Sequence, residues 1–193
     1  MRPLKTPHNE PEWETHSIET VYDNPWITVT HREVTAPTGQ PGIYGMVHFK
    51  NLALAVIPID ADGNTWLVGQ HRYTLNQYAW EIPEGGGLRN VDPLITAKRE
   101  LREETGISAN RWTPLLTLHT SNSVTDEVAY AYIAQELSFG EKDYDDTERL
   151  EVIKMPLEEA VERVMIGEIT DGLAIASLLK AQRMVDKGLL VIR

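Results

Sequence analysis

Apolar residues fall in short runs over most of the chain. The runs are rich in Val, Ile, Tyr and Trp and are separated by turn residues, a pattern typical of β-strands. They span residues 17–22, 26–34, 43–49, 52–59, 65–71 and 78–82, and further runs follow at 112–119, 127–135 and 149–155. Asp62, Gly63 and Asn64 stand between two of these runs and predict a hairpin.

A helix is predicted over residues 93–104. Asp92 precedes it as an N-cap, Pro93 occupies the first helical position, and Gly106 follows its end. The three glycines at 85–87 predict a tight loop before this helix.

Two more helices are predicted near the end of the chain. One runs from Pro156 to about residue 166, and the other is capped by Asp171 and runs to about residue 187. Strands around one glycine loop and helix, followed by two helices, predict an α/β domain whose mixed sheet packs between helices. Residues 1–14 are rich in Pro, Glu and His and predict a loose tail.

Charge and cysteine content narrow the classes of function. The formal charge of −11 argues against a nucleic-acid groove or an anionic membrane surface as a partner. There is no cysteine, which excludes thiolate catalysis and Cys-type zinc sites and fits a reducing compartment. No signal peptide or long apolar run is present, so we expect a cytoplasmic protein.

Three glutamates crowd the end of the first predicted helix. At helical spacing Glu100 and Glu104 fall along the edge of its apolar stripe, with Glu103 just beyond. Two carboxylates about 5 Å apart repel by roughly 3 kcal/mol at an effective dielectric of 20. Either the face is a solvated acidic surface, or a hard ion such as Mg²⁺ or Mn²⁺ binds there, with Arg99 orienting a carboxylate.

The stretch from Gly85 to Ile107 resembles the Nudix box, which is Gly, five residues, Glu, seven residues, then Arg-Glu-apolar-x-Glu-Glu-x-Gly-apolar. Every position from Arg99 onward matches, whereas the first glutamate of the box is replaced by Val91. The segments "HRYTLNQYAWEIPEGGG" and "GEITDGLAIASLL" resemble the ADP-ribose pyrophosphatase and nucleoside diphosphate sugar hydrolase branch of that superfamily.

This resemblance implies a Nudix fold, an α/β/α sandwich with a mixed β-sheet and an N-terminal antiparallel β-extension. We expect residues 15–49 to form N-terminal strands that take part in a homodimer, as they do in relatives, and residues 50–193 to form the hydrolase domain. The implied reaction is a Mg²⁺-dependent hydrolysis (Mn²⁺ being the other candidate) of ADP-ribose or a related nucleoside diphosphate sugar.

Candidate residues follow from the resemblance. The expected metal ligands are Glu100, Glu104, Glu103 and the backbone carbonyl of Glu84, and the expected general base is Asp146 or Glu148 in "DYDDTERLEV". Arg72 is a candidate diphosphate clamp, or else a salt bridge at a strand end. Further candidates for contact with substrate are Glu81, Trp26, Tyr78, Trp80 and Glu127, although aromatic residues in strands commonly belong to the core.

Two alternatives remain beside this hypothesis. One is a Nudix-fold module that senses such a ligand without cutting it, and the departure at Val91 is the feature that favours it. The other is a hydrolase acting on a dinucleoside polyphosphate or coenzyme A, because substrate choice is loosely encoded in a fold.

Overall fold

The computed structural model describes residue 4, residues 12–141 and residues 150–192. It divides into two units, one of Met1–Lys50 with Ser121–Asp126 and one of Asn51–Thr120 with Glu127–Arg193. Within the described residues, no helix combines the length and apolar character needed to cross a membrane.

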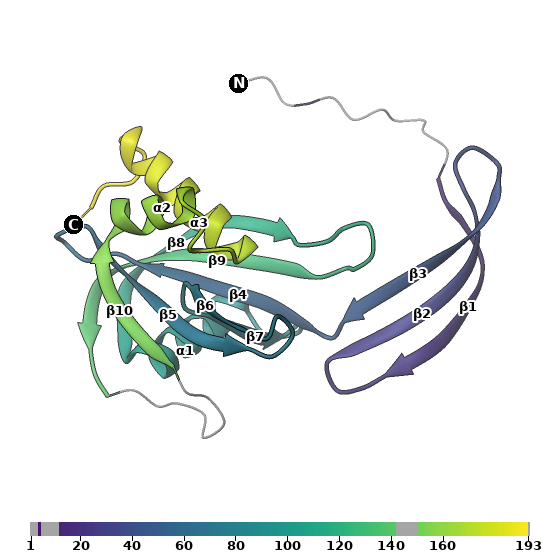
Figure 1. Cartoon of the computed structure of the whole chain (residues 1–193), viewed down its shortest axis with the longest axis horizontal. Coiled ribbons are helices and arrows are strands. Elements are labelled where there is room, and N and C mark those ends of the chain that lie inside the picture. The colour runs from purple at the N-terminus through teal and green to yellow at the C-terminus, as the bar shows by residue number, and fades with distance from the viewer. Residues whose placement is uncertain (1–3, 5–11, 142–149, 193) are drawn as a thin grey trace. The chain divides into compact units, whose positions relative to one another are not determined.

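The N-terminal unit is a three-stranded antiparallel sheet, seen as a twisted ribbon in Figure 1. Its strands, in spatial order, are β1 (Glu14–Asp23), β2 (Ile27–Thr35) and β3 (Pro41–Phe49). The segment 121–126 attaches to β3, because Asp126 accepts a hydrogen bond from the Phe49 amide at 2.9 Å and lies 2.5 Å from Nδ1 of His48. All residues of β1 are exposed.

Among its described residues, the second unit contains two sheets and three helices. One sheet has the order β7-β4-β9-β8 and the other the order β10-β5-β6, and β4 pairs with β9 in parallel while every other pair is antiparallel. The elements are β4 (Asn51–Pro58), β5 (Asn64–Arg72), β6 (Gln77–Glu81), β7 (Glu84–Leu88), α1 (Pro93–Thr105), β8 (Ile107–His119), β9 (Val128–Phe139), β10 (Glu151–Pro156), α2 (Leu157–Met165) and α3 (Gly172–Asp186).

Strand β4 is buried on both faces, which explains its unbroken apolar run. Leu54 and Val56 point to the side of α1 and pack with Leu101. Ile57 points to the other side and packs in the larger core with Leu178 of α3. Figure 1 shows the corresponding layers, with α1 below the sheets and α2 and α3 above them. The predicted α/β fold with a mixed sheet between helices is confirmed.

The helix limits are also confirmed. The Asp92 side chain accepts a hydrogen bond from the Leu94 amide at 2.9 Å, and Gly106 ends α1 with a left-handed φ of 71°. The Asp171 side chain caps α3 by accepting from the Ala174 amide at 2.6 Å. Helix α2 begins directly after Pro156.

The prediction of a loop at Gly85–Gly87 is wrong, because these residues form strand β7. Gly85, Gly86 and Gly87 pair with Leu54, Ala53 and Leu52 of β4. Glycine is depleted in strands and carries no alternation of apolar side chains, so the pairing had no local signal. The strand predicted over 112–119 likewise begins earlier, at Ile107.

Candidate functional site

Helix α1 approaches strand β7 so closely that two strand positions have no room for a side chain. A Cβ atom at Gly85 would collide with the carboxylate of Glu100. One at Gly87 would lie 2.6 Å from Oγ1 and 2.8 Å from Cγ2 of Thr96. The glycines therefore form a cradle that receives the side chains of the helix.

The three glutamates of α1 differ in exposure, and the two that contact strand β7 are the least exposed. The Glu104 residue is 5% exposed, and its Oε2 accepts a hydrogen bond from the backbone amide of Glu84 at 3.0 Å. Side-chain exposure is 12% for Glu100 and 27% for Glu103. Thus the helix face is not a solvated acidic surface, because two of its carboxylates contact β7.

Arg99 ties this face together. Its guanidinium donates to Glu103 Oε2 at 2.6 Å, to the carbonyl of Gly86 at 3.1 Å and to Glu100. One cation thus contacts two of the three acids and the glycine strand, and the orienting role of Arg99 stays a prediction.

A second group of charges surrounds Arg72 at the end of β5. Its guanidinium makes a two-pronged contact with Glu81, from Nε to Oε1 at 2.8 Å and from Nη2 to Oε2 at 2.5 Å. Nη2 also donates to Glu84 Oε1 at 2.7 Å. The Glu81 side chain is 5% exposed, and its hydrogen bonds raise the pKa of the Arg72 guanidinium. A two-pronged ion pair with a buried carboxylate is stronger than a salt bridge between exposed side chains.

Asp171 brings a third acid to Glu81 and Glu84. One ligand oxygen from each of these three residues can be chosen so that all lie within 4.8 Å of one another. Burial raises the pKa of Glu84 well above its usual range, the negative charges of Asp171, Glu81 and Glu104 raise it further, and Arg72 opposes the shift. Glu84 therefore connects the Arg72 group with the acidic face of α1.

The aromatic candidates are placed differently. Tyr78 is about half exposed, donates to Glu151 at 3.2 Å, and contacts Trp80 edge to face with ring centroids 5.5 Å apart. Trp80 packs against the larger core, as the alternative reading of strand aromatics expects. Trp26 is 66% exposed and belongs to the N-terminal unit.

Within the described residues, Glu127 makes its hydrogen bond away from these groups. Glu127 accepts a hydrogen bond from the Thr120 hydroxyl at 2.5 Å, where β8 turns toward β9. Asp146 and Glu148, the two candidates for the general base, lie outside the described residues.

The donors present fit a hard divalent cation. Glu100 and Glu104 offer only oxygen, in a place where the absence of side chains at β7 leaves room for the Glu100 carboxylate. This geometry is compatible with the predicted magnesium or manganese site. Its ligands stay a prediction, namely Glu100, Glu103, Glu104 and the Glu84 carbonyl.

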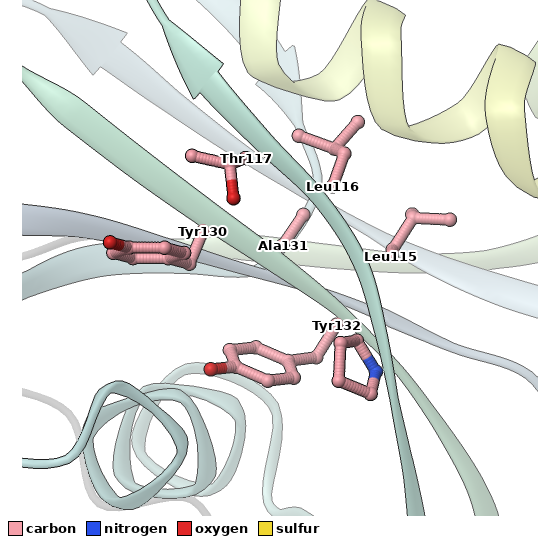
Figure 2. Close-up of a pocket in the computed structure, with 7 residues that line it drawn as sticks. Leu115, Leu116, Thr117, Tyr130, Ala131 and Tyr132 are labelled. Atoms are coloured by element: carbon pink, nitrogen blue, oxygen red, sulfur yellow. The ribbon is translucent and has the colours of Figure 1, made fainter. Parts of the chain in front are cut away.

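A cavity of about 260 Å³ opens elsewhere in this unit, on strands β8 and β9. Figure 2 shows the residues that line it, which are Pro114, Leu115, Leu116, Thr117, Tyr130, Ala131 and Tyr132. It lies at the bulge of β8 between Pro114 and Leu116. None of its lining residues is an acid or a base of the groups above, so we do not assign the chemistry to it.

Two features of the site were not predicted. Asp171 was interpreted only as a helix cap, and Glu84 only as a backbone carbonyl. The unusual density of acids in "WEIPEG" was the available signal for Glu84. Nothing local links Asp171 to it, because the contact depends on how α3 packs against the sheets.

Comparisons with known proteins agree with this architecture. The family described as NUDIX domain matches residues 50–172, and the nucleoside diphosphate sugar hydrolase N-terminal domain matches residues 13–47.

Two curated relatives share most of the chain. An ADP-ribose pyrophosphatase of Mycobacterium tuberculosis is 34% identical over 177 residues, which cover 88% of this chain and 83% of the relative. An ADP-ribose pyrophosphatase of Bacillus subtilis is 32% identical over 163 residues, which cover 83% and 88%. A crystal structure of an ADP compounds hydrolase matches with a TM-score of 0.82 at 20% identity, over 98% of this chain and 100% of that one, and supports the fold.

Proposed function

Because the chain belongs to the Nudix hydrolase family, we propose that it hydrolyses ADP-ribose or a related nucleoside diphosphate sugar to a nucleoside monophosphate and a sugar phosphate. The observation that carries this proposal is the close packing of the α1 glutamates on the glycines of β7, because it gathers carboxylates where a phosphate-bound cation needs them. The activity for which both relatives are named supports the choice of substrate.

The proposed cation ligands are Glu100, Glu104, Glu103 and the carbonyl of Glu84. When bound, Mg²⁺ or Mn²⁺ would supply positive charge to the diphosphate and lower the pKa of a coordinated water. Arg99 holds the carboxylates of Glu100 and Glu103 in place for this purpose.

Arg72 is proposed to bind the diphosphate by exchanging partners. Its Nη2 donates to both Glu81 and Glu84, whereas Nε donates to Glu81 alone. Release of Glu84 would leave the guanidinium anchored by Glu81 and open to a phosphate oxygen. Glu81 then acts by orienting Arg72.

In the hydrolysis itself, water attacks a phosphorus of the diphosphate, and the bridging P–O bond breaks. Asp146 or Glu148 is proposed to take the proton of the water. Trp26, Tyr78 and Trp80 are proposed to contact the nucleobase of the substrate, and Glu127 is proposed to lie beside the substrate. The Tyr78 residue is about half exposed, which supports such a contact.

The experiment is hydrolysis by the purified chain with Mg²⁺ and either ADP-ribose or GDP-mannose, with products separated by ion-exchange chromatography. We expect AMP and ribose 5-phosphate, or GMP and mannose 1-phosphate, and no product after removal of the metal by EDTA. If neither sugar nucleotide is cut, the proposal fails. Tight ADP-ribose binding without turnover, unchanged in Glu104→Gln, would favour the ligand-sensing module instead.

A homodimer is also proposed, formed through the N-terminal strands. The strands of this unit expose apolar side chains to water, including Ile18 and Tyr22 of β1 and Ile43 of β3. Sedimentation should show a species of twice 21.8 kDa, and a monomer alone would contradict it. A cytoplasmic location stays a prediction.

A further inference from the structure

The carboxylates of Glu81, Glu84 and Asp171 carry more negative charge than their neighbour Arg72 neutralises. When all three carboxylates are ionised, as cation binding requires, they and the one guanidinium sum to two negative charges in a half-buried group. The Glu81 and Glu84 side chains are only 5% and 15% exposed, so water screens this charge poorly.

One oxygen of the group has no hydrogen-bond partner among the described residues. Glu84 Oε1 accepts from Arg72, but Glu84 Oε2 is fully buried and accepts no hydrogen bond from the described residues. A buried acceptor left without a partner is costly and rare, and its presence commonly marks an ion or proton that belongs there.

We propose that Glu81, Glu84 and Asp171 form a divalent-cation site of their own, additional to the one expected at the glutamates of α1. The three residues come from β6, β7 and the N-terminus of α3, so the site joins segments that the box helix does not provide. All donors are carboxylate oxygens, which select a hard ion such as Mg²⁺ or Mn²⁺ over zinc or copper.

Arg72 and a cation can share the group because each carboxylate oxygen has two lone pairs and because Arg72 leaves one oxygen of Glu84 unused. Arg72 takes both oxygens of Glu81 and Oε1 of Glu84, whereas Glu84 Oε2 remains. Asp171 Oδ1 accepts a hydrogen bond from the Ala174 amide at 2.6 Å, so the second carboxylate oxygen of Asp171 is the one proposed to bind the cation. A divalent ion matches the two uncompensated charges.

The site is tested by counting bound Mn²⁺, because free Mn²⁺ gives an electron paramagnetic resonance signal that binding removes. The metal-free chain is titrated with MnCl₂ as the parent and as Asp171→Asn. Asparagine keeps the helix cap but removes a charged ligand. We expect the variant to lose one equivalent of bound Mn²⁺ or to bind that equivalent at least about tenfold more weakly, a difference of about 1.4 kcal/mol.

Asp186→Asn is the matched control, since Asp186 is an exposed acid at the other end of the same helix. It should bind Mn²⁺ like the parent. Glu84→Gln provides a second variant at the site, which should reproduce the loss even where Asp171→Asn does not fold. The site is refuted if Mn²⁺ affinity falls less than tenfold in a site variant that folds. It is also refuted if Asp186→Asn loses as much Mn²⁺ binding as the site variants. A proton shared among the carboxylates would then be the occupant.

Glu100→Gln separates this site from the box helix. It should weaken Mn²⁺ binding at α1 while keeping the equivalent that Asp171→Asn loses. If Glu100→Gln removes all bound Mn²⁺, the three carboxylates hold no ion by themselves and the inference is refuted. None of these measurements requires hydrolysis, so a failure of the proposed function would be seen separately.

Discussion

Replacing Gly85 with alanine should disturb the Glu100 carboxylate while leaving the fold almost intact. A Cβ atom at this position would collide with the carboxyl carbon and both carboxylate oxygens of Glu100. These atoms are the end of a flexible side chain, so Glu100 can turn away without moving the backbone of α1. The neighbouring Gly86 offers a control, because its nearest obstacle is Asn51 Nδ2 at 3.8 Å.

Gly85→Ala should change stability little and activity strongly. A side chain forced from its preferred rotamer costs about 0.5–1.5 kcal/mol. Alanine in place of glycine restricts the unfolded chain and thereby raises the free energy of unfolding by about 0.4–1 kcal/mol. The free energy of unfolding of Gly85→Ala should therefore stay within about 1 kcal/mol of the parent value. Displacing a catalytic group by about 1 Å, in contrast, lowers the rate about a hundredfold, which corresponds to about 2.7 kcal/mol in the barrier.

The assay pairs kcat/KM for ADP-ribose at saturating Mg²⁺ with urea denaturation of the same preparations. Gly86→Ala should keep the parental rate and stability. The reasoning is refuted if Gly85→Ala retains more than about a tenth of the parental kcat/KM, or if Gly86→Ala loses as much activity as Gly85→Ala.

Three further outcomes follow from the structure. Gly87→Ala should lower the free energy of unfolding by about 1–3 kcal/mol, measured in urea, because the new methyl group meets the buried, stiff side chain of Thr96; an unchanged midpoint would contradict this close contact. Glu104→Gln should lower kcat/KM at least about a hundredfold with little change in melting temperature, and near-parental turnover would remove Glu104 from the site. Burial raises the pKa of Asp60, but hydrogen bonds from Lys154 and from Asn64 outweigh it and hold that pKa below its usual 3.8. The ionised form therefore stabilises the fold fully at a pH above the usual value, and this stabilisation is lost as the pH falls through the lower folded pKa. Asp60→Asn should reduce the melting temperature more at neutral pH than at strongly acid pH, and an equal reduction at both would refute the linkage.

Most elements were predictable because their signals are local. Helix α1 carries its limits in Asp92 and Gly106, and the structure gives both the expected conformations. Strand β4 was predicted by its apolar run, which packs on both faces. Such features depend on residues close together in sequence, where the period of apolar positions identifies the element.

The site was predictable only in part, for a physical reason. Glu100 and Glu104 are one helical turn apart, so their common face follows from the sequence alone. The grouping of Asp171 with Glu84 depends on the packing of α3 against the sheets, which no local pattern encodes. The capping of α3 already explained an aspartate at position 171, so no feature of the sequence indicated that Asp171 lies beside Glu81 and Glu84.

The alternation of side chains along a strand explains why β7 needs two glycines of its three. Residues 85 and 87 face the same side of the sheet, and both would collide with α1 if they carried a Cβ atom. Gly86 faces the other side and has space. A side chain at 87 would press on the stiff Thr96 side chain and hold α1 away, whereas one at 85 would displace only the Glu100 carboxylate. The feature that hid this strand from prediction is therefore the one that lets the acidic helix reach the backbone of the site.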